Sequence, residues 1–491
     1  MSSRVGTLVV LLLLLQMVPL ALLATSPPVE AQGGIVIGPD ERVVWENGTR
    51  NLTTGVEIFG KLTVRDYELR FNLSVDGEAS FRVMEGGVLE FENASLLHDN
   101  LSAYFFFKVE GTFVAHDSEI EWLTGQFVTG GGIKVVSGTV ELYDTRLHDC
   151  EVQGVYVEGR GGSVLLDNCT LERMQYGVHV NEFGEATVRN GCVIDEFTKA
   201  GVLVNFGEAR VSNAVLGSDM TGSSQGVAVR GSDLTMEDCQ VHDVSQEGVE
   251  LADGSTGNIT DCNIRNATVG IRMDDSTASV LRCSISDCVD GLNLLASSPE
   301  VTDCVLSDNF NGVSSKDCSN GYSLESCIIG RNSQYGIYAV GKGLSETYTT
   351  WSHDGEGNGI ARVIQWWTLD VNVTDKDAIP ISSAQVVVRY ANGTRAHNST
   401  TDALGSVRGI DLEGHRIGND GTLVEQEKYQ VHIEKGQRWA EKGVRMDKDK
   451  VLTVVLGEEP DITESGWFWV IPVVVVLLVV VVVGYWWFRI R

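Results

Sequence analysis

A repeat of about 22 residues fills the middle of this chain and limits its possible folds more than any other feature. Each unit has a glycine followed by two apolar residues that flank a variable one, as in Gly154-Val155-Tyr156-Val157. The pattern recurs at Gly154, Gly177, Gly201, Gly226, Gly248, Gly270, Gly291, Gly312 and Gly336, with spacings of 23, 24, 25, 22, 22, 21, 21 and 24 residues. A fixed period over so many units is typical of a solenoid, in which each unit buries its apolar residues only against its neighbours.

A second element, apolar-x-apolar, precedes eight of these glycines, seven of them by eight or nine residues and Gly226 by twelve, and it usually begins with cysteine. Its members are Cys169/Leu171, Cys192/Ile194, Ala214/Leu216, Cys239/Val241, Cys262/Ile264, Cys283/Ile285, Cys304/Leu306 and Cys327/Ile329. Such alternating stretches, separated by Asn, Asp, Gly and Ser, predict short strands joined by tight turns. No helical period lies between them, which excludes leucine-rich and ankyrin repeats. We therefore expect three-sided coils whose strands pair in parallel with the next coil, about 4.8 Å away.

These residues resemble the right-handed parallel β-helix family, the pectate-lyase-like superfold, which includes polysaccharide-processing and adhesin-type surface proteins. The resemblance covers residues 138–340 and extends more weakly over 44–137, through units such as 87–96 and 111–120. It implies an all-β fold, with a right-handed parallel β-helix over residues 32–362. Such a motif specifies the architecture and leaves the activity open.

The ten cysteines all fall between residues 150 and 327. Seven occupy the inward position described above, Cys150 and Cys288 lie on a second rung five residues later, and Cys318 stands apart. Parallel neighbours about 4.8 Å apart exceed the usual Cβ separation of about 3.8 Å in a disulfide. No CxxC pair or zinc-type Cys/His spacing occurs. We expect reduced thiols that pack as small apolar side chains; the alternatives are a disulfide staple or a metal ladder.

A second domain is expected over residues 363–457, where about seven short alternating strands predict a small β-sandwich. The run 400–405, with 378–380 upstream, resembles the carboxypeptidase-regulatory/transthyretin-like module, and this resemblance implies no catalytic motif. Trp366 and Trp367 open the domain, and we expect them to pack at its junction with the last coil rather than to stack on a sugar.

The two ends of the chain predict export and anchoring. Residues 1–31 have the order of a secretory signal peptide: Arg4, an apolar core and small residues before a cleavage site after Ala31; a retained N-terminal anchor is the alternative. Residues 467–488 carry no charge and are followed by two arginines, with aromatic residues at both ends. This predicts a transmembrane helix after a linker at 458–466, with 489–491 in the cytoplasm and the ectodomain outside; a buried core helix is the alternative.

Charge and sequons fit an exported surface protein. The chain has 37 Lys+Arg and 67 Asp+Glu, so its net charge is −30 and its pI about 4.6. The absence of a basic patch in the sequence argues against nucleic-acid binding. Candidate N-glycosylation sites are Asn47, Asn51, Asn72, Asn93, Asn100, Asn168, Asn258, Asn266, Asn372, Asn392 and Asn398.

In this superfold, functional residues lie on the outer face of one sheet. The variable residue of each glycine unit points outward, because strand side chains alternate. The resulting candidate carbohydrate-contact stripe is Tyr156, His179, Glu250, Arg272, Asn293, Ser314 and Tyr338, interrupted by Leu203 and Ala228. The tyrosines would stack on sugars, Asn293 and Ser314 would supply hydrogen bonds, and His179 is expected to be solvated.

The stripe contains only one adjacent pair of charges, Glu250 and Arg272, which we interpret as a cross-coil ion pair with turn-forming Asp274 and Asp275 beside it. Acid/base cleavage of a polysaccharide needs at least two placed groups, so we assign no catalytic residue. No cofactor or metal site is expected, although turn carboxylates could bind Ca²⁺ weakly. The sequence therefore predicts a membrane-anchored, non-catalytic surface protein for adhesion or contact with polysaccharide or cell-envelope glycans. The alternative is a tethered polysaccharide lyase or glycoside hydrolase.

Overall fold

The structure is a computed structural model. It describes residues 34–457, except for 72, 74–78, 100–104, 122, 124–131, 219–221, 319–320, 341–360, 418–422 and 426–427. The predicted signal peptide and the predicted span at 467–488 lie outside the described residues. Within the described residues, no helix is long and apolar enough to cross a membrane. The described part divides into two compact units, the first made mainly of residues up to 333 and the second mainly of residues from 334 onward.

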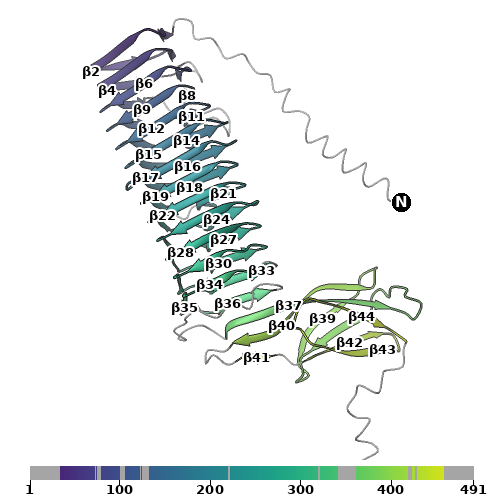
Figure 1. The fold of residues 1–491 in the computed structure, drawn as a ribbon. Coiled ribbons are helices and arrows are strands. Elements are labelled where there is room, and N and C mark those ends of the chain that lie inside the picture. The colour runs from purple at the N-terminus through teal and green to yellow at the C-terminus, as the bar shows by residue number, and fades with distance from the viewer. Residues whose placement is uncertain are drawn as a thin grey trace, which may run out of the picture. The chain divides into compact units, whose positions relative to one another are not determined.

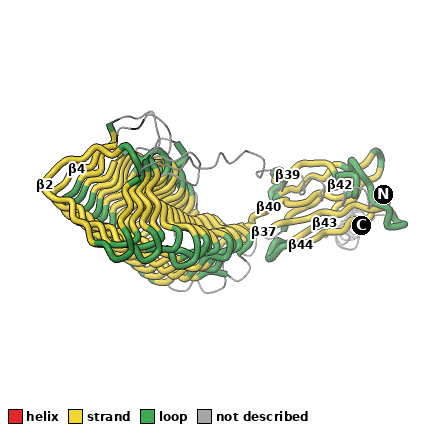
Figure 2. Tube along the Cα trace, turned by 90° about the horizontal axis from the view of Figure 1, so that it is seen from above, coloured by secondary structure: helices red, strands yellow, loops and turns green. Residues whose placement is uncertain are grey.

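The first unit is a right-handed parallel β-helix, whose coils stack in one column (Figure 1). The residues that the structure describes form about 12 such turns. Each coil has three faces, and Figure 2 shows its turns, in green, recurring at the same corners of successive coils. This confirms the solenoid predicted from the repeat.

The glycine face contains the Gly-apolar-x-apolar strands. It consists of β1 (Ile35–Ile37), β3 (Val56–Ile58), β5 (Ser80–Val83), β8 (Phe106–Val109), β11 (Ile133–Val135), β14 (Gln153–Glu158), the second parts of β16 (Thr170–Asn181) and β18 (Val193–Asn205), β21 (Gln225–Arg230), β24 (Glu247–Ala252), β27 (Val269–Asp274), β30 (Asp290–Leu295) and β33 (Asn311–Lys316).

The middle face follows the glycine face in each coil. It consists of the first parts of β2 (Arg42–Leu52) and β4 (Lys61–Phe71), then β6 (Val88–Glu92), β9 (Thr112–His116), β12 (Thr139–Tyr143), β15 (Ser163–Asp167), β17 (Glu185–Arg189), β19 (Glu208–Ser212), β22 (Asp233–Glu237), β25 (Thr256–Thr260), β28 (Thr277–Leu281), β31 (Glu300–Thr302) and β34 (Ser323–Glu325).

The cysteine face closes each coil. It consists of the second parts of β2 and β4, β7 (Ser95–His98), β10 (Glu119–Glu121), β13 (Arg146–His148), the first parts of β16 and β18, β20 (Val215–Gly217), β23 (Gln240–His242), β26 (Asn263–Arg265), β29 (Ser284–Ser286), β32 (Val305–Ser307) and β35 (Ile328–Gly330).

The corner between the middle and cysteine faces depends on one residue with positive φ. Asn168, Asp261 and Asp303 each have φ of 54°, a conformation that Asn and Asp adopt more readily than most residues. The next residue in each case is a cysteine that points into the coil, and all ten cysteines are buried and free. Their thiols donate to backbone carbonyls, as Cys283 does to the oxygen of Leu281 at 3.4 Å. The inward cysteine rung thus packs as the sequence predicts.

The glycine of each unit is required by close packing rather than by its φ. A Cβ on Gly248 would lie 2.5 Å from Cγ2 of Ile264 and 2.7 Å from the carbonyl oxygen of Gly270. Atoms in ordinary van der Waals contact lie about 3.5–4.0 Å apart. The glycine therefore lets the cysteine face and the glycine face meet at a tight corner inside the coil.

The second unit contains β36 (Tyr335–Val340), which pairs in parallel with β37 (Ala361–Thr374). β37 also pairs with β40 (Ser406–Ile417) and β44 (Lys450–Val455), and β40 pairs with β41 (Leu423–Glu425). A separate antiparallel sheet has the order β39 (Arg395–Thr400), β38 (Gln385–Arg389), β42 (Tyr429–Lys435) and β43 (Arg438–Val444). Strands of both groups contribute to one apolar core. The assignment of this region to a carboxypeptidase-regulatory/transthyretin-like β-sandwich stays a prediction.

Candidate functional site

The outward stripe predicted on the glycine face is a continuous ladder in the first unit. Tyr156, His179, Leu203, Ala228, Glu250, Arg272 and Asn293 are register partners from one strand to the next. Ser314 lies on β33 of the same face and is half-buried. Tyr338 belongs to the second unit, where its ring stacks on Tyr335 with centroids 5.2 Å apart.

The first part of the stripe is more buried than the sequence suggests. Tyr156 is only 1% exposed, with its ring centroid 5.0 Å from that of His179 and Nζ of Lys134 5.7 Å from its centre. His179 is half-buried rather than solvated, and burial lowers its pKa to about 4. Its ring nitrogens lie 2.9 Å from Nε2 of Gln153 and 3.3 Å from Nδ2 of Asn205. This part of the face is therefore a neutral, packed surface.

The next part of the stripe carries a cluster of five polar side chains, which we call the Glu–Arg cluster: Gln225, Arg230, Glu247, Glu250 and Arg272. Nε2 of Gln225 donates to Oε2 of Glu247 and to Oε2 of Glu250, each at 2.9 Å. Arg230 lies 2.7 Å from Oε2 of Glu250, and Nη1 of Arg272 lies 3.4 Å from Oε1 of Glu247. The register neighbours Glu250 and Arg272 thus take other partners, which corrects the predicted ion pair between them.

The polar surface continues on the following coils. Nη2 of Arg272 lies 3.4 Å from Oδ2 of Asp274. Asp290 accepts a hydrogen bond from Asn293 at 2.7 Å and one from Asn311 at 2.8 Å. Nε of Arg272 and Oδ1 of Asn311 are buried and have no hydrogen-bond partner among the described residues.

Glu247 is the residue that sequence reasoning missed. Strict alternation back from Glu250 would turn Glu247 into the coil. The tight corner at Gly248 interrupts that alternation, and the parallel register passes from Glu247 to Val249 without pairing the glycine. The residue before each repeat glycine therefore points outward as well, which also places Gln225, Asp290 and Asn311 on this face. The signal was present in the sequence as the polar residue that precedes the glycine.

In the Glu–Arg cluster two negative carboxylates are balanced by two positive guanidinium groups. The side chains of Glu247 and Glu250 are 11% and 12% exposed, whereas those of Arg230 and Arg272 are each 37% exposed. Each carboxylate has a guanidinium partner and an amide donor, so the charges largely neutralise each other. The exposed parts of the guanidinium groups face solvent and can donate to a ligand. Among the residues the structure describes, no group of three His, Cys, Asp or Glu side chains could hold a metal ion.

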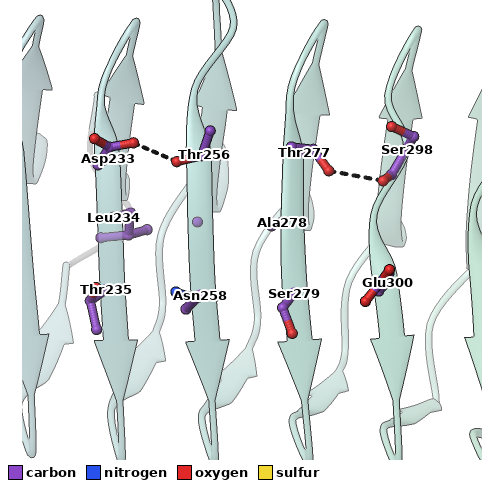
Figure 3. A pocket seen from close by; sticks show the side chains of 11 residues that line it. Asp233, Leu234, Thr235, Thr256, Asn258, Thr277, Ala278, Ser279, Ser298 and Glu300 are labelled. Carbon is purple, nitrogen blue, oxygen red and sulfur yellow. Dashed lines mark hydrogen bonds between the residues drawn. The ribbon is translucent and has the colours of Figure 1, made fainter.

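A shallow groove of about 410 Å³ lies on the middle face, across β22, β25, β28 and β31 (Figure 3). One row of its side chains is Asp233, Thr256, Thr277 and Ser298, and a parallel row is Thr235, Asn258, Ser279 and Glu300. Thr256 donates to Asp233, and Thr277 donates to the carbonyl oxygen of Ser298 at 2.9 Å. Asn258, a candidate glycosylation site, is exposed here, so a glycan on it would lie over this groove.

The other candidate glycosylation sites lie mostly at the surface. Asn72 and Asn100 are outside the described residues, and Asn266 and Asn372 are half-buried. The exposed candidates are Asn47, Asn51, Asn93, Asn168, Asn392 and Asn398. At two corners the amide is already engaged: Asn93 donates to Asp66 at 2.7 Å and Asn168 to Asp144 at 2.6 Å.

Comparison with known proteins supports the fold. A family described as the right-handed β-helix region matches residues 200–349. No curated protein matches the chain. Among solved structures, the periplasmic alginate epimerase AlgG aligns with a TM-score of 0.43 and 11% identity, over 57% of this chain and 76% of that chain.

Two further solved structures show weaker similarity. The A-module of the Azotobacter vinelandii mannuronan C-5 epimerase AlgE6 has a TM-score of 0.26 and 10% identity, over 62% of this chain and 90% of that one. The enzymatically active domain of tailspike protein 2 from bacteriophage CBA120 has a TM-score of 0.31 and 12% identity, over 81% and 71%. Similarities at this level say nothing about the activity of this chain.

Proposed function

We propose that the outer face of β21, β24, β27 and β30 binds an extended polysaccharide without cleaving it. The Glu–Arg cluster is the observation that carries this proposal, because it presents guanidinium, carboxylate and amide groups on three successive coils. Asp290 and Asn293 of β30 continue the polar face on a fourth coil. Parallel coils repeat at about 4.8 Å, so a chain of sugars that runs along the stack meets a new polar side chain at each step. Hydroxyl groups would bind the carboxylates and amides, and a uronate carboxylate would bind Arg230 or Arg272.

Arg272 gives the sharpest test of binding, because its side chain is 37% exposed and its contact with Glu247 is long, at 3.4 Å. Binding of the full-length chain in detergent to a uronate-containing glycan array would be compared with that of Arg272→Ala. We expect the variant to lose at least tenfold in affinity, since one charge-assisted contact contributes about that much.

The matched control is Arg282→Ala. Arg282 also forms an ion pair across coils, with Asp261 at 2.5 Å, but it lies at the corner between the middle and cysteine faces. The Arg282→Ala variant should bind the glycan with an affinity within twofold of that of the unaltered protein. Equal losses in the two variants, or no loss at Arg272, would contradict the placement of the binding site.

A second candidate function is cleavage of an acidic polysaccharide, and the pair Glu247 and Glu250 favours it. Both carboxylates accept from the same nitrogen of Gln225, so their oxygens lie less than twice 2.9 Å apart. Carboxyl pairs about 5–9.5 Å apart serve as acid and base or nucleophile in glycosidases. In this protein each carboxylate is already held by an arginine and by the amide of Gln225, so both are engaged within the cluster.

Turnover of pectate, alginate and other uronate-rich glycans, with and without Ca²⁺, separates the two functions. We expect no cleavage. Measurable cleavage that is lost in Glu247→Gln or Glu250→Gln would replace the binding proposal by the enzymatic one. The glutamine variants keep the size of the side chain, so a loss of activity would report the carboxylate rather than a packing defect.

We also propose that the protein is exported and held at the cell membrane by residues 467–488. The apolar run and its aromatic and arginine flanks support this location. Removal of residues 467–491 should release the protein into the medium, whereas the intact chain should sediment with membranes. A truncated form that still sediments after loss of its leader would contradict the proposal.

A further inference from the structure

We infer that the corner between the glycine and middle faces carries a second glycan-binding site, a platform of two phenylalanines that binds an amino-sugar chain. Phe183 follows β16 and Phe206 follows β18, at the same corner of successive coils, and their side chains are 59% and 55% exposed. The backbone N–H of Phe183 donates to the carbonyl oxygen of Phe206 at 2.5 Å, so the two residues are held in register. We call this pair the aromatic corner.

The aromatic corner is costly for the fold, which argues for a role outside the fold. Phe183 and Phe206 have φ of 71° and 55°, a region that bulky residues rarely occupy. The same corner holds Gly231, Asp253 and Ala296 in later coils, which are smaller residues with φ of 56°, 58° and 50°. The packing of the coil therefore does not require an aromatic ring. Strained backbone that displays an exposed apolar ring is typical of a functional surface.

The surface beside the rings has room for a ligand. A groove of about 340 Å³ runs past both phenylalanines and is floored by glycines, among them Gly184, Gly207 and Gly231. A Cβ on Gly231 would lie 2.8 Å from two carbon atoms of the Phe206 ring. The absence of a side chain there leaves the next coil flat beside the ring. The groove thus combines two apolar rings with a smooth floor.

The charges along this groove select the chemistry of its ligand. Its lining includes the carboxylate side chains of Glu185, Glu208 and Asp233, and Arg210 lies 2.6 Å from Glu208. Arg160 lies 4.8 Å from the centre of the Phe183 ring, in a cation–π contact. Aromatic rings pack against the C–H faces of sugars, and carboxylates accept hydrogen bonds from hydroxyl and ammonium groups. A glucosamine-type chain satisfies both groups, whereas a uronate chain would be repelled.

The test is a calorimetric titration of the full-length chain in detergent with chitosan hexasaccharide at pH 5.5, where its amines are protonated. Phe183→Ala and Phe206→Ala should each weaken binding about tenfold, as expected for the loss of one stacked ring. Neither change alters the charge of this strongly acidic protein, so a loss cannot arise from weaker nonspecific attraction. Alanine is smaller than phenylalanine at the same positive φ, and both variants should melt no earlier than the unaltered protein.

Three comparisons make the result decisive. Phe310→Ala, which removes a ring that is 48% exposed at a different corner, should leave binding within twofold. Uncharged cellohexaose should bind more weakly than chitosan hexasaccharide, and oligogalacturonate should not compete. Arg272→Ala should leave chitosan binding unchanged, so failure of this site and failure of the site on the glycine face are distinguishable. No binding of chitosan, or binding that is insensitive to both phenylalanine substitutions, would overturn the inference.

Discussion

Gly270→Ala tests the physical reason for the repeat. The glycine has ordinary φ, so the substitution introduces no left-handed strain; it adds only a methyl group at the tight corner inside the coil. That Cβ would lie 2.3 Å from Cγ2 of Ile285 and 2.5 Å from the carbonyl oxygen of Gly291. The second contact is with the backbone of the next coil, which cannot move away without disturbing the parallel register.

The expected cost follows from these distances. Contacts more than 1 Å shorter than the normal 3.5–4.0 Å force the coils apart, and overpacking of this kind costs about 1–3 kcal/mol. Because two contacts are affected and one is backbone, we expect the upper end, about 3 kcal/mol. Alanine also restricts the unfolded chain, which offsets about 0.4–1 kcal/mol. The net loss in free energy of unfolding should be about 2 kcal/mol.

The assay is urea unfolding followed by circular dichroism, compared with Gly154→Ala. The coil at Gly154 has a leucine in place of isoleucine, and an added Cβ would make longer contacts there: 2.7 Å to the carbonyl oxygen of Gly177, 2.9 Å to Sδ of Met174 and 3.2 Å to Leu171. The methionine side chain is flexible and can move away. Gly154→Ala should therefore cost less than Gly270→Ala. Ile285→Leu removes the β-branch and should partly rescue Gly270→Ala. Equal costs at both glycines, or no rescue, would refute the steric explanation.

Two further predictions concern titratable groups in the β-helix. Burial lowers the pKa of His179 to about 4, below the value of about 6.5 expected in the unfolded chain. The neutral His179 contributes at most about 3 kcal/mol to the free energy of unfolding; this contribution should be complete above pH 6.5 and lost as the pH falls toward 4. The free energy of unfolding of His179→Gln should lack this part of the pH dependence. Burial also raises the pKa of Cys150 to about 12 and that of Cys288 to about 11. Iodoacetamide at pH 8 should label neither thiol until the chain is denatured, and disulfides between successive coils would contradict the packing of the cysteine face.

The interior of the β-helix could be predicted from the sequence because its constraints repeat in every coil. The inward positions must be small or apolar, and they return at the same place in each unit. One sequence therefore shows the same constraint many times, and the pattern can be recognised. The Cys262 and Ile264 positions illustrate this: both are at most 2% exposed, as the alternation predicts. The tight corner at the repeat glycine was not predicted. Its requirement comes from atoms that lie 16 or more residues away in the sequence, such as Ile264 at the end of the same coil and the carbonyl oxygen of Gly270 in the next coil, both against Gly248.

The exterior follows no such repeat, and its polar groups depend on partners about one coil away. Arg230 meets Glu250 across 20 residues and Arg272 meets Glu247 across 25, and neither pairing follows the strand register. A long guanidinium side chain can reach diagonally to a neighbouring strand, so a ladder of register partners does not determine its ion pairs. The alternation in the sequence predicts the face on which Glu250 and Arg272 lie, but it does not predict which residues form ion pairs with them.

Departures from the repeat are therefore more informative about function than the repeat itself. Each unit of the repeat from Gly154 onward has a glycine at the tight corner, so those glycines say only that the coils stack. A phenylalanine with positive φ at a corner that elsewhere holds Gly, Asp or Ala has no such explanation, and neither does a glutamate directly before the repeat glycine. The stacking of coils does not require these residue types, because many other residues could occupy the same exposed or polar positions. The two proposed sites lie at such departures. In both, the fold holds side chains in a rigid row, one position per coil, at a spacing that an extended glycan can follow.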